Sequence, residues 1–201
     1  MTIFVGLTGG IATGKSTIVE FLQKNGYKVH DSDLVVNKMY SQPTNKLFAT
    51  LRKIGLSKSI KKNQINKKII RDEIFSSKTK KKKLEQFIHK EVRISRNLFI
   101  KKHKNKKNKI IFFDIPLLFE AKLSHICHYI ILFYAPKKIK IERALKRKNI
   151  NKKIITKILK NQIDDKTKKK KSDYIINTSK PKKHSFKMIL KAISNILEQN
   201  A

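Results

Sequence analysis

Residues 9–17 read GGIATGKST, and this short stretch decides the fold. It fits the pattern G-x-x-x-x-G-K-[ST], which predicts a turn whose backbone N–H groups surround a phosphate. The residues that the pattern fixes are Gly9, Gly14, Lys15 and Ser16. The apolar run IFVGL at 3–7 precedes the turn and an amphipathic helical pattern follows it, as the motif requires. The alternative is a glycine turn that only packs a strand against a helix, and the joint presence of motif and context disfavours it.

Five continuous apolar runs are typical of strands buried on both faces, because they lack the alternation of half-exposed strands. They are IFVGL at 3–7, YKVHD at 27–31, KIIFFD at 109–114, YIILFY at 129–134 and DYIIN at 173–177. Amphipathic helical patterns lie between or after them, at 17–26, 84–99 and 186–197. Strands that alternate with helices predict an α/β fold with a five-stranded parallel sheet flanked by helices. In such a fold, ligands bind outside the carboxyl ends of the strands.

The uneven spacing of these runs predicts additional parts of the fold. The second and third runs are much further apart in the sequence than one crossover helix requires, so we expect a helical insertion between them. A second lysine-rich helical stretch separates the fourth run from the fifth, at a natural place for the lid of a phosphotransferase. The expected parts are a nucleotide-binding core, a helical substrate domain and a lid. The core comprises 1–33, 109–135 and 170–201, the substrate domain 34–108 and the lid 136–169.

The turn at 9–17, here called the P-loop, supplies most of the predicted nucleotide contacts. Its glycines allow N–H groups to point inward, the next helix presents its positive N-terminus, and Lys15 reaches the β- and γ-oxygens of ATP. Ser16 is a predicted Mg²⁺ ligand, and Asp114 at the end of its strand is another, directly or through water. A capping acid at a strand end is the alternative for Asp114. The loop residues expected at the nucleotide are Gly9, Gly10, Ala12, Thr13, Gly14, Lys15, Ser16 and Thr17.

The sequence HDSD places two carboxylates directly after the second strand. A carboxylate at this edge of the sheet accepts the proton of an attacking hydroxyl group, and so acts as a general base. Alternation along an extended chain puts Asp31 and Asp33 on one face, so either residue fits this role. A cap of the next helix is the alternative role for Asp33.

Arginine is scarce in this lysine-rich chain, yet Arg143 and Arg147 lie four residues apart in the expected lid. At this spacing both side chains lie on one face of a helix. Closed over a nucleotide, the two guanidinium groups stabilise the charge on the transferred phosphoryl group. We therefore expect both to bind the nucleotide and Arg143 also to be catalytic. A solvated helix face is the alternative.

The net charge is strongly positive, with 49 Lys and Arg against 14 Asp and Glu, which gives +35. Such a charge suggests a nucleic-acid partner. However, the basic residues are almost all lysine, whereas arginine makes the bidentate contacts of sequence readers. The runs KTKKKK and KKHKNKKNK also contain no aromatic residue for base stacking. Lysine, asparagine and isoleucine share A- and T-rich codons, so compositional bias explains the excess, and we expect no specific nucleic-acid partner.

Other features of the composition limit the protein class. Cys127 is the only cysteine, which excludes an internal disulfide, and no ordered His cluster beside it indicates zinc. No apolar run approaches the roughly 18 residues of a membrane span, and no charged leader precedes the glycines. We therefore expect a cytoplasmic protein without a membrane partner. The sequence leaves the oligomeric state open.

The segment FFDIPLLFE at 112–120 indicates which group accepts the phosphate. Together with three further segments, it resembles the dephospho-coenzyme A kinase family over nearly the whole chain. These segments are LTGGIATGKST at 7–17, HDSDLVV at 30–36 and SDYIINTS at 172–179. DIPLLFE is the most specific part of the resemblance, because many enzymes share a P-loop.

The resemblance implies a P-loop kinase that uses ATP and Mg²⁺ to phosphorylate the ribose 3′-hydroxyl of dephospho-coenzyme A, the last step of coenzyme A biosynthesis. It also implies that Asp33, ahead of Asp31, is the base, and that the inserted helices surround the coenzyme A part. The chain departs from the family pattern at Ala12, usually glycine, and at Thr178, usually asparagine. Alternatives are a nucleotide or nucleoside kinase of the same fold, because fold does not fix the acceptor, or a basic nucleic-acid-binding protein.

Overall fold

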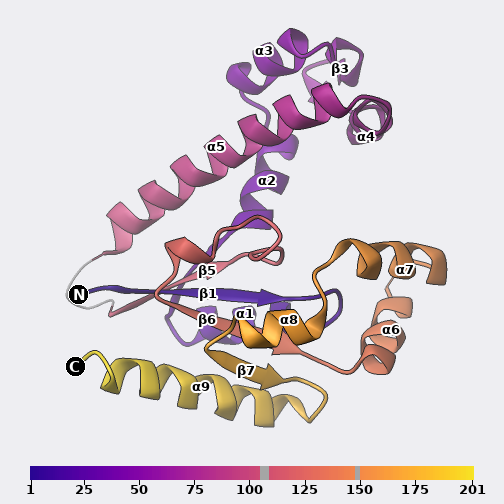
Figure 1. The fold of residues 1–201 in the computed structure, drawn as a ribbon. Coiled ribbons are helices and arrows are strands. Elements are labelled where there is room, and N and C mark those ends of the chain that lie inside the picture. Colours follow the sequence, from indigo (N-terminus) through magenta and orange to yellow (C-terminus); the bar gives the residue numbers. More distant parts are fainter. Residues whose placement is uncertain (105–108, 148–149) are drawn as a thin grey trace. The chain divides into compact units, whose positions relative to one another are not determined.

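The computed structural model describes residues 1–104, 109–147 and 150–201 (Figure 1). The basic run KKHKNKKNK, the expected substrate domain and the expected lid each extend into residues outside this description. The chain forms two compact units, here called unit 1 and unit 2. Unit 1 comprises Met1–His30 and His103–Ala201, and unit 2 comprises Asp31–Lys102.

Unit 1 contains a five-stranded sheet with the strand order β2-β5-β1-β6-β7. The strands are β1 (Ile3–Gly9), β2 (Lys28–Asp31), β5 (Ile110–Asp114), β6 (Tyr129–Tyr134) and β7 (Tyr174–Asn177). β1 pairs in parallel with β5 and β6, and β6 pairs in parallel with β7. Each of the five apolar runs forms one of these strands, so the expected α/β fold with a parallel sheet is confirmed.

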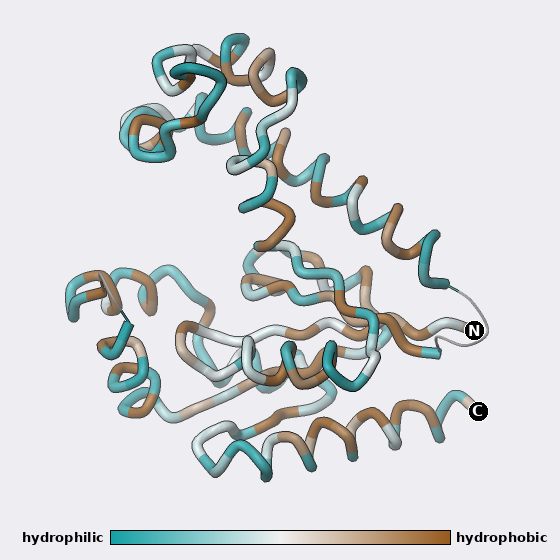
Figure 2. The backbone as a smooth tube through the Cα atoms, turned by 180° about the vertical axis from the view of Figure 1, so that it is seen from behind, coloured by the Kyte–Doolittle hydropathy of each residue, from teal (hydrophilic) through white to brown (hydrophobic). Residues whose placement is uncertain are grey.

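Helices follow and flank the sheet in unit 1 (Figure 1). They are α1 (Lys15–Lys24), α6 (Lys137–Leu145), α7 (Lys152–Asn161), α8 (Asp165–Lys170), α9 (Lys182–Glu198) and the short 3₁₀ helix η2 (Ser124–Ile126). Hydrophobic and hydrophilic residues alternate along α9 (Figure 2), as expected of an amphipathic helix. Phe186 of α9 stacks on Phe21 of α1, with 4.2 Å between the ring centroids. Buried residues of both helices and of the strands form one core.

The register of the strands brings Asp114 close to the start of the P-loop. Leu7 of β1 pairs with Asp114, the last residue of β5, and Gly9 pairs with Phe133 of β6. The loop therefore leaves the sheet at the carboxyl edge, between two neighbouring strands, where ligands of parallel sheets bind.

Unit 2 is mostly helical and has a small core of its own. Its elements are α2 (Ser32–Ser41), α3 (Asn45–Lys53), η1 (Ser57–Ser59), β3 (Ile60–Lys61), β4 (Gln64–Ile65), α4 (Lys67–Ser76) and α5 (Lys78–His103). The buried core residues are Leu47, Leu51, Leu56, Ile70 and Leu84. Within the ranges that the structure describes, none of the helices combines the length and the apolar character needed to cross a bilayer.

A two-stranded antiparallel hairpin, β3 with β4, interrupts the helices of unit 2. Its two turn residues, Lys62 and Asn63, have backbone φ values of 47° and 57°. Two consecutive left-handed residues are typical of a type I′ turn, which usually contains Asn-Gly or a similar pair. Lys-Asn lacks the glycine, so this hairpin had no clear indication in the amino-acid pattern.

Candidate nucleotide-binding site

The P-loop backbone turns through two left-handed residues. Gly14, with φ 78° and ψ 11°, is the N-cap of α1, and Ala12 has φ 56°. The Thr13 hydroxyl donates to the Gly10 carbonyl over 3.0 Å and closes the turn. In the described part of the chain, no side chain caps α1, which leaves the first N–H groups of the helix for an anion.

Ala12, where the resembling family usually has glycine, has two opposing effects. A left-handed conformation costs an L-residue with a Cβ about 1–2 kcal/mol, so the alanine strains the loop. Its side chain, however, is buried with Ala144 of α6 and Ile155 of α7 in a small apolar cluster. The methyl group therefore connects the phosphate-binding turn to the helices that follow β6.

Lys15 and Asp114 form an ion pair at the carboxyl edge of the sheet. Lys15 Nζ lies 2.5 Å from Asp114 Oδ1, and the side chains are only 12% and 5% exposed. The pairing of β1 with β5 explains the contact, because it sets the end of β5 beside the strand that leads into the loop. Two residues that were selected separately from the sequence are thus brought together.

The donor atoms at this edge fit Mg²⁺ held by a nucleotide better than a resident metal. Mg²⁺ is commonly bound through one or two carboxylates, waters and substrate phosphates. Asp114 supplies a carboxylate, and Ser16 lies in the first turn of α1, one residue after Lys15. Among the described residues there is no group of three or more His, Cys, Asp or Glu side chains that is able to hold a metal by itself.

Asp31 and Asp33 differ in their local structure, and one sequence expectation about them was wrong. Asp31 ends β2 and caps α2, because its Oδ1 accepts a hydrogen bond from the Leu34 N–H over 2.8 Å. Asp33 already lies in the first turn of α2. The two carboxylates are therefore not on one face of an extended chain, since the helix begins at Ser32. The capping role considered for Asp33 belongs to Asp31.

Arg143 is anchored beside the P-loop, whereas Arg147 lies beyond the helix that was expected to carry both. The Arg143 guanidinium donates to the Thr178 carbonyl over 2.7 Å and to its hydroxyl over 3.3 Å. Helix α6 ends at Leu145, so the prediction of one shared helix face was wrong for Arg147. Both arginines nevertheless line the same pocket.

This pocket adjoins the start of α1 and is lined by several basic side chains. Its lining residues are Ala12, Gly14, Thr17, Ile18, Arg143, Arg147, Thr178, Lys180, Lys182 and Ser185. They come from the P-loop, from α1, from the segment around α6 and from the segment after β7. Four basic side chains around a glycine turn favour an anionic ligand such as a nucleotide.

Thr178, Gln162 and Lys140 belong to this region, although sequence reasoning did not select them as site residues. The Thr178 hydroxyl donates to the Thr13 carbonyl over 2.6 Å and so connects β7 to the P-loop. Gln162 Oε1 accepts from the N–H of Ile11 over 3.4 Å. Lys140 is 3% exposed and pairs with Asp165 at 2.6 Å. In the segment SDYIINTS, Thr178 was noted only because the resembling family usually has asparagine there. Gln162 and Lys140 had no local indication in the sequence.

Comparison with known proteins decides the family. The family model for dephospho-CoA kinase matches residues 3–183. The chain belongs to the dephospho-CoA kinase family. A dephospho-CoA kinase of Fusobacterium nucleatum is 31% identical, and the match covers 93% of this chain and 95% of that protein. One of Helicobacter pylori is 32% identical, with 96% and 97% covered.

A solved structure agrees with this membership. The dephospho-CoA kinase from Campylobacter jejuni is 29% identical to this chain, with a TM-score of 0.72. The match covers 100% of each chain. The resemblance noted in the sequence is therefore confirmed, as is the P-loop kinase fold. As a dephospho-CoA kinase family member, the chain is a phosphotransferase of coenzyme A biosynthesis.

Proposed function

We propose that this chain transfers the terminal phosphoryl group of ATP to the ribose 3′-hydroxyl of dephospho-coenzyme A. The observation that carries the proposal is the contact between Lys15 and Asp114 at the mouth of the P-loop, in a chain that matches the family over most of its length. A lysine and a carboxylate at this edge are the pair that phosphoryl transfer requires for the phosphates and for Mg²⁺.

The P-loop holds the nucleotide in this proposal. Lys15 exchanges its contact with Asp114 for the β- and γ-oxygens, and the first N–H groups of α1, which no side chain among the described residues caps, bind the same phosphates. Asp114 and Ser16 would hold Mg²⁺, which would supply positive charge against the negative charge of the phosphates. The ion pair of Lys15 with Asp114 supports this assignment, because it puts both side chains within reach of one phosphate position.

Residues that follow β6 complete the nucleotide site. Arg143 is positioned by Thr178 beside Gly14, so its guanidinium is ready to stabilise charge on the transferred group. Arg147 lines the same pocket. The proposed lid, 136–169, includes α6, α7 and α8, and it excludes water that otherwise accepts the phosphoryl group.

Unit 2 is the proposed site for the coenzyme A part of the acceptor. Its separate apolar core supports an inserted unit with a function of its own, which we propose as the substrate domain at 34–108. Asp33, in the first turn of α2, is the proposed base that accepts the proton of the 3′-hydroxyl group.

A panel of acceptors tests the proposed function. With ATP and Mg²⁺, we expect phosphorylation of dephospho-coenzyme A and at most trace phosphorylation of AMP, adenosine or shikimate, measured as ADP release and as the mass of the product. The mass must increase by one phosphate on the acceptor. Efficient phosphorylation of AMP or adenosine, with none of dephospho-coenzyme A, would identify a nucleotide or nucleoside kinase of the same fold instead.

The positive charge leads to a second prediction. At +35 some salt-sensitive adhesion to DNA is expected, because each phosphate contact releases counterions. At about 150 mM salt, where the screening length is roughly 8 Å, excess random duplex DNA is expected to leave the phosphorylation rate almost unchanged. The measurement is the initial rate with and without DNA. Tight DNA binding at this salt concentration, together with no phosphorylation of any acceptor, contradicts the kinase proposal.

A further inference from the structure

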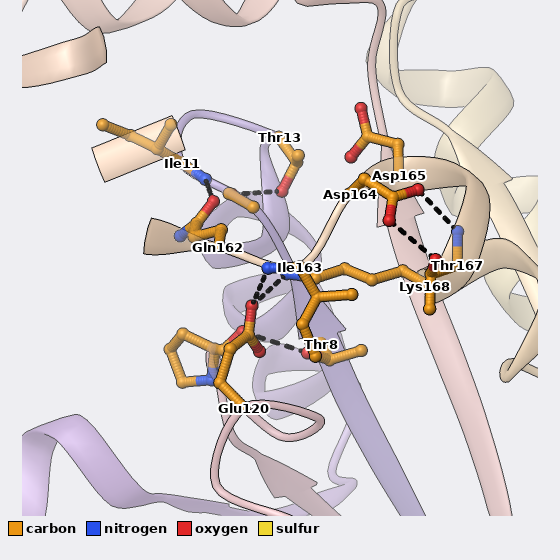
Figure 3. A network of polar contacts seen from close by, with 12 residues as sticks. Thr8, Ile11, Thr13, Glu120, Gln162, Ile163, Asp164, Asp165, Thr167 and Lys168 are labelled. Carbon is orange, nitrogen blue, oxygen red and sulfur yellow. Dashed lines mark hydrogen bonds and ion pairs between the residues drawn. The ribbon is translucent and has the colours of Figure 1, made fainter. Parts of the chain in front are cut away.

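Glu120, the last residue of the DIPLLFE segment, lies in a polar network with Lys168 and Ile163 (Figure 3). Its Oε1 lies 2.8 Å from Lys168 Nζ of α8 and accepts a hydrogen bond from the N–H of Ile163 over 3.0 Å. Lys168 is 1% exposed and Glu120 is 16% exposed, so the ion pair is buried. The proposed nucleotide chemistry gives this glutamate no role.

A buried ion pair of this kind is a poor source of stability by itself. Removing two charges from water costs several kcal/mol per ion, which their attraction offsets only with good geometry and further hydrogen bonds. Glu120 Oε2 is buried and accepts no hydrogen bond from the described residues, so the pair is not fully compensated. What Glu120 does fix is the position of Ile163, whose N–H donates a hydrogen bond to its Oε1.

The residue before Ile163 reaches the P-loop. Gln162 Oε1 accepts from the N–H of Ile11 over 3.4 Å, and it lies 3.1 Å from the point where a Cβ on Gly10 would stand. Glycine at position 10 therefore allows the carboxamide to approach the loop backbone. The network thus runs without a break from the end of DIPLLFE, through the segment between α7 and α8, to the phosphate-binding turn (Figure 3).

We propose that the Glu120–Lys168 ion pair positions Gln162 against the P-loop, which makes Glu120 and Gln162 positioning residues of phosphoryl transfer. The inference rests on the proposed function, because it assigns the P-loop to the nucleotide phosphates. The Gln162 carboxamide keeps the Gly10–Ile11 peptide in one orientation before the nucleotide binds. A loop that is already ordered loses less conformational entropy on binding and presents its N–H groups to the transition state in place.

Four variants test this inference. Glu120→Gln keeps the shape of the side chain but leaves the buried Lys168 without its counter-charge. Gln162→Ala removes only the last contact with the loop. The double variant E120Q/Q162A combines the two changes. Glu198→Gln, at the exposed end of α9, is the control for loss of one carboxylate charge.

Two measurements are made on each variant. In the nucleotide-free protein, hydrogen exchange of the Ile11 amide is expected to be about 2- to 10-fold faster in E120Q and Q162A, and unchanged in E198Q, because a lost hydrogen bond contributes roughly 0.5–1.5 kcal/mol. With ATP, kcat/KM is expected to fall about 10- to 100-fold in E120Q and Q162A. Because Glu120 acts through Gln162, the double variant is expected to be no slower than the slower single variant.

The outcomes separate positioning from a purely structural role. If E120Q lowers the melting temperature but leaves Ile11 exchange and kcat/KM of the folded enzyme at wild-type values, the inference is wrong. Additive losses of kcat/KM in the double variant also overturn it. If E120Q does not fold, E120Q/K168M removes both charges and takes its place in the series. If wild-type protein fails to phosphorylate dephospho-coenzyme A, the proposed function fails, and Ile11 exchange still decides whether Glu120 positions Gln162.

Discussion

Replacing Lys15 with alanine is expected to lower kcat by a factor on the order of 10³ or more, because the ammonium group serves the β- and γ-phosphates in the transition state. The structure adds a consequence for stability. Lys15 is the ion-pair partner of Asp114, a carboxylate that is only 5% exposed, so the variant leaves a buried charge without this partner. We expect a destabilisation of about 3 kcal/mol and therefore a lower melting temperature.

A second substitution separates the two effects of Lys15→Ala. Adding Asp114→Asn removes the buried charge that faced Lys15 and is expected to restore much of the melting temperature, but it restores no turnover, since Asp114 is the proposed Mg²⁺ ligand. Lys24→Ala, in the last turn of the same helix, is the matched control with wild-type turnover. Steady-state rates are measured well below each melting temperature. Substantial turnover in folded Lys15→Ala would falsify the assignment of the P-loop.

The central strands β1, β5 and β6 were predictable from the sequence because they are buried on both faces, whereas the outer strands β2 and β7 are only partly buried. A short continuous apolar run such as KIIFFD is typical of a strand of a parallel sheet, and β5 is buried along its whole length. The P-loop was predictable for a different reason, since glycines, lysine and serine at this fixed spacing, between a strand and a helix, are typical of phosphate binding. With both located, the parallel pairing of β1 and β5 already implies that Asp114 lies beside Lys15.

The helices were less predictable where apolar periodicity stops. The periodic pattern at 84–99 indicated a helix, yet α5 spans Lys78–His103 and includes the lysine run at its start. Lysine is a good helix former, so propensity extends the helix beyond its packed face. Conversely, α6 ends at Leu145 without a glycine or proline to mark the end, which is why Arg147 was wrongly placed on that helix.

The polar network of Glu120, Lys168 and Gln162 had no local indication in the sequence. Glu120 and Lys168 are 48 positions apart in a chain with many lysines, and nothing in composition distinguishes the one that is buried. The motif DIPLLFE marked Glu120, but only folding selects its partner. These contacts form only when folding places Gln162 and Ile163, between α7 and α8, beside Ile11 and Glu120.

The choice between Asp31 and Asp33 as the base leads to the second large expected effect. Asp33→Asn is expected to lower kcat by roughly 10²- to 10⁴-fold while ATP affinity stays at the wild-type value, because an amide does not accept the proton of the 3′-hydroxyl group. Asp31→Asn is the matched control two residues away. Its side chain caps α2, and asparagine is as good an N-cap as aspartate, so stability and kcat are expected to remain close to wild type.

Both variants are assayed for ATP binding by calorimetry and for turnover with dephospho-coenzyme A. The two substitutions are expected to differ strongly in effect. The N-cap function of Asp31 is preserved by asparagine, whereas the proposed base function of Asp33 is lost in asparagine. A severe loss of kcat in Asp31→Asn with a mild one in Asp33→Asn would move the base to Asp31. Mild losses in both variants would mean that positioning and electrostatic stabilisation carry the reaction without a side-chain base, as the loose transition state of phosphoryl transfer permits.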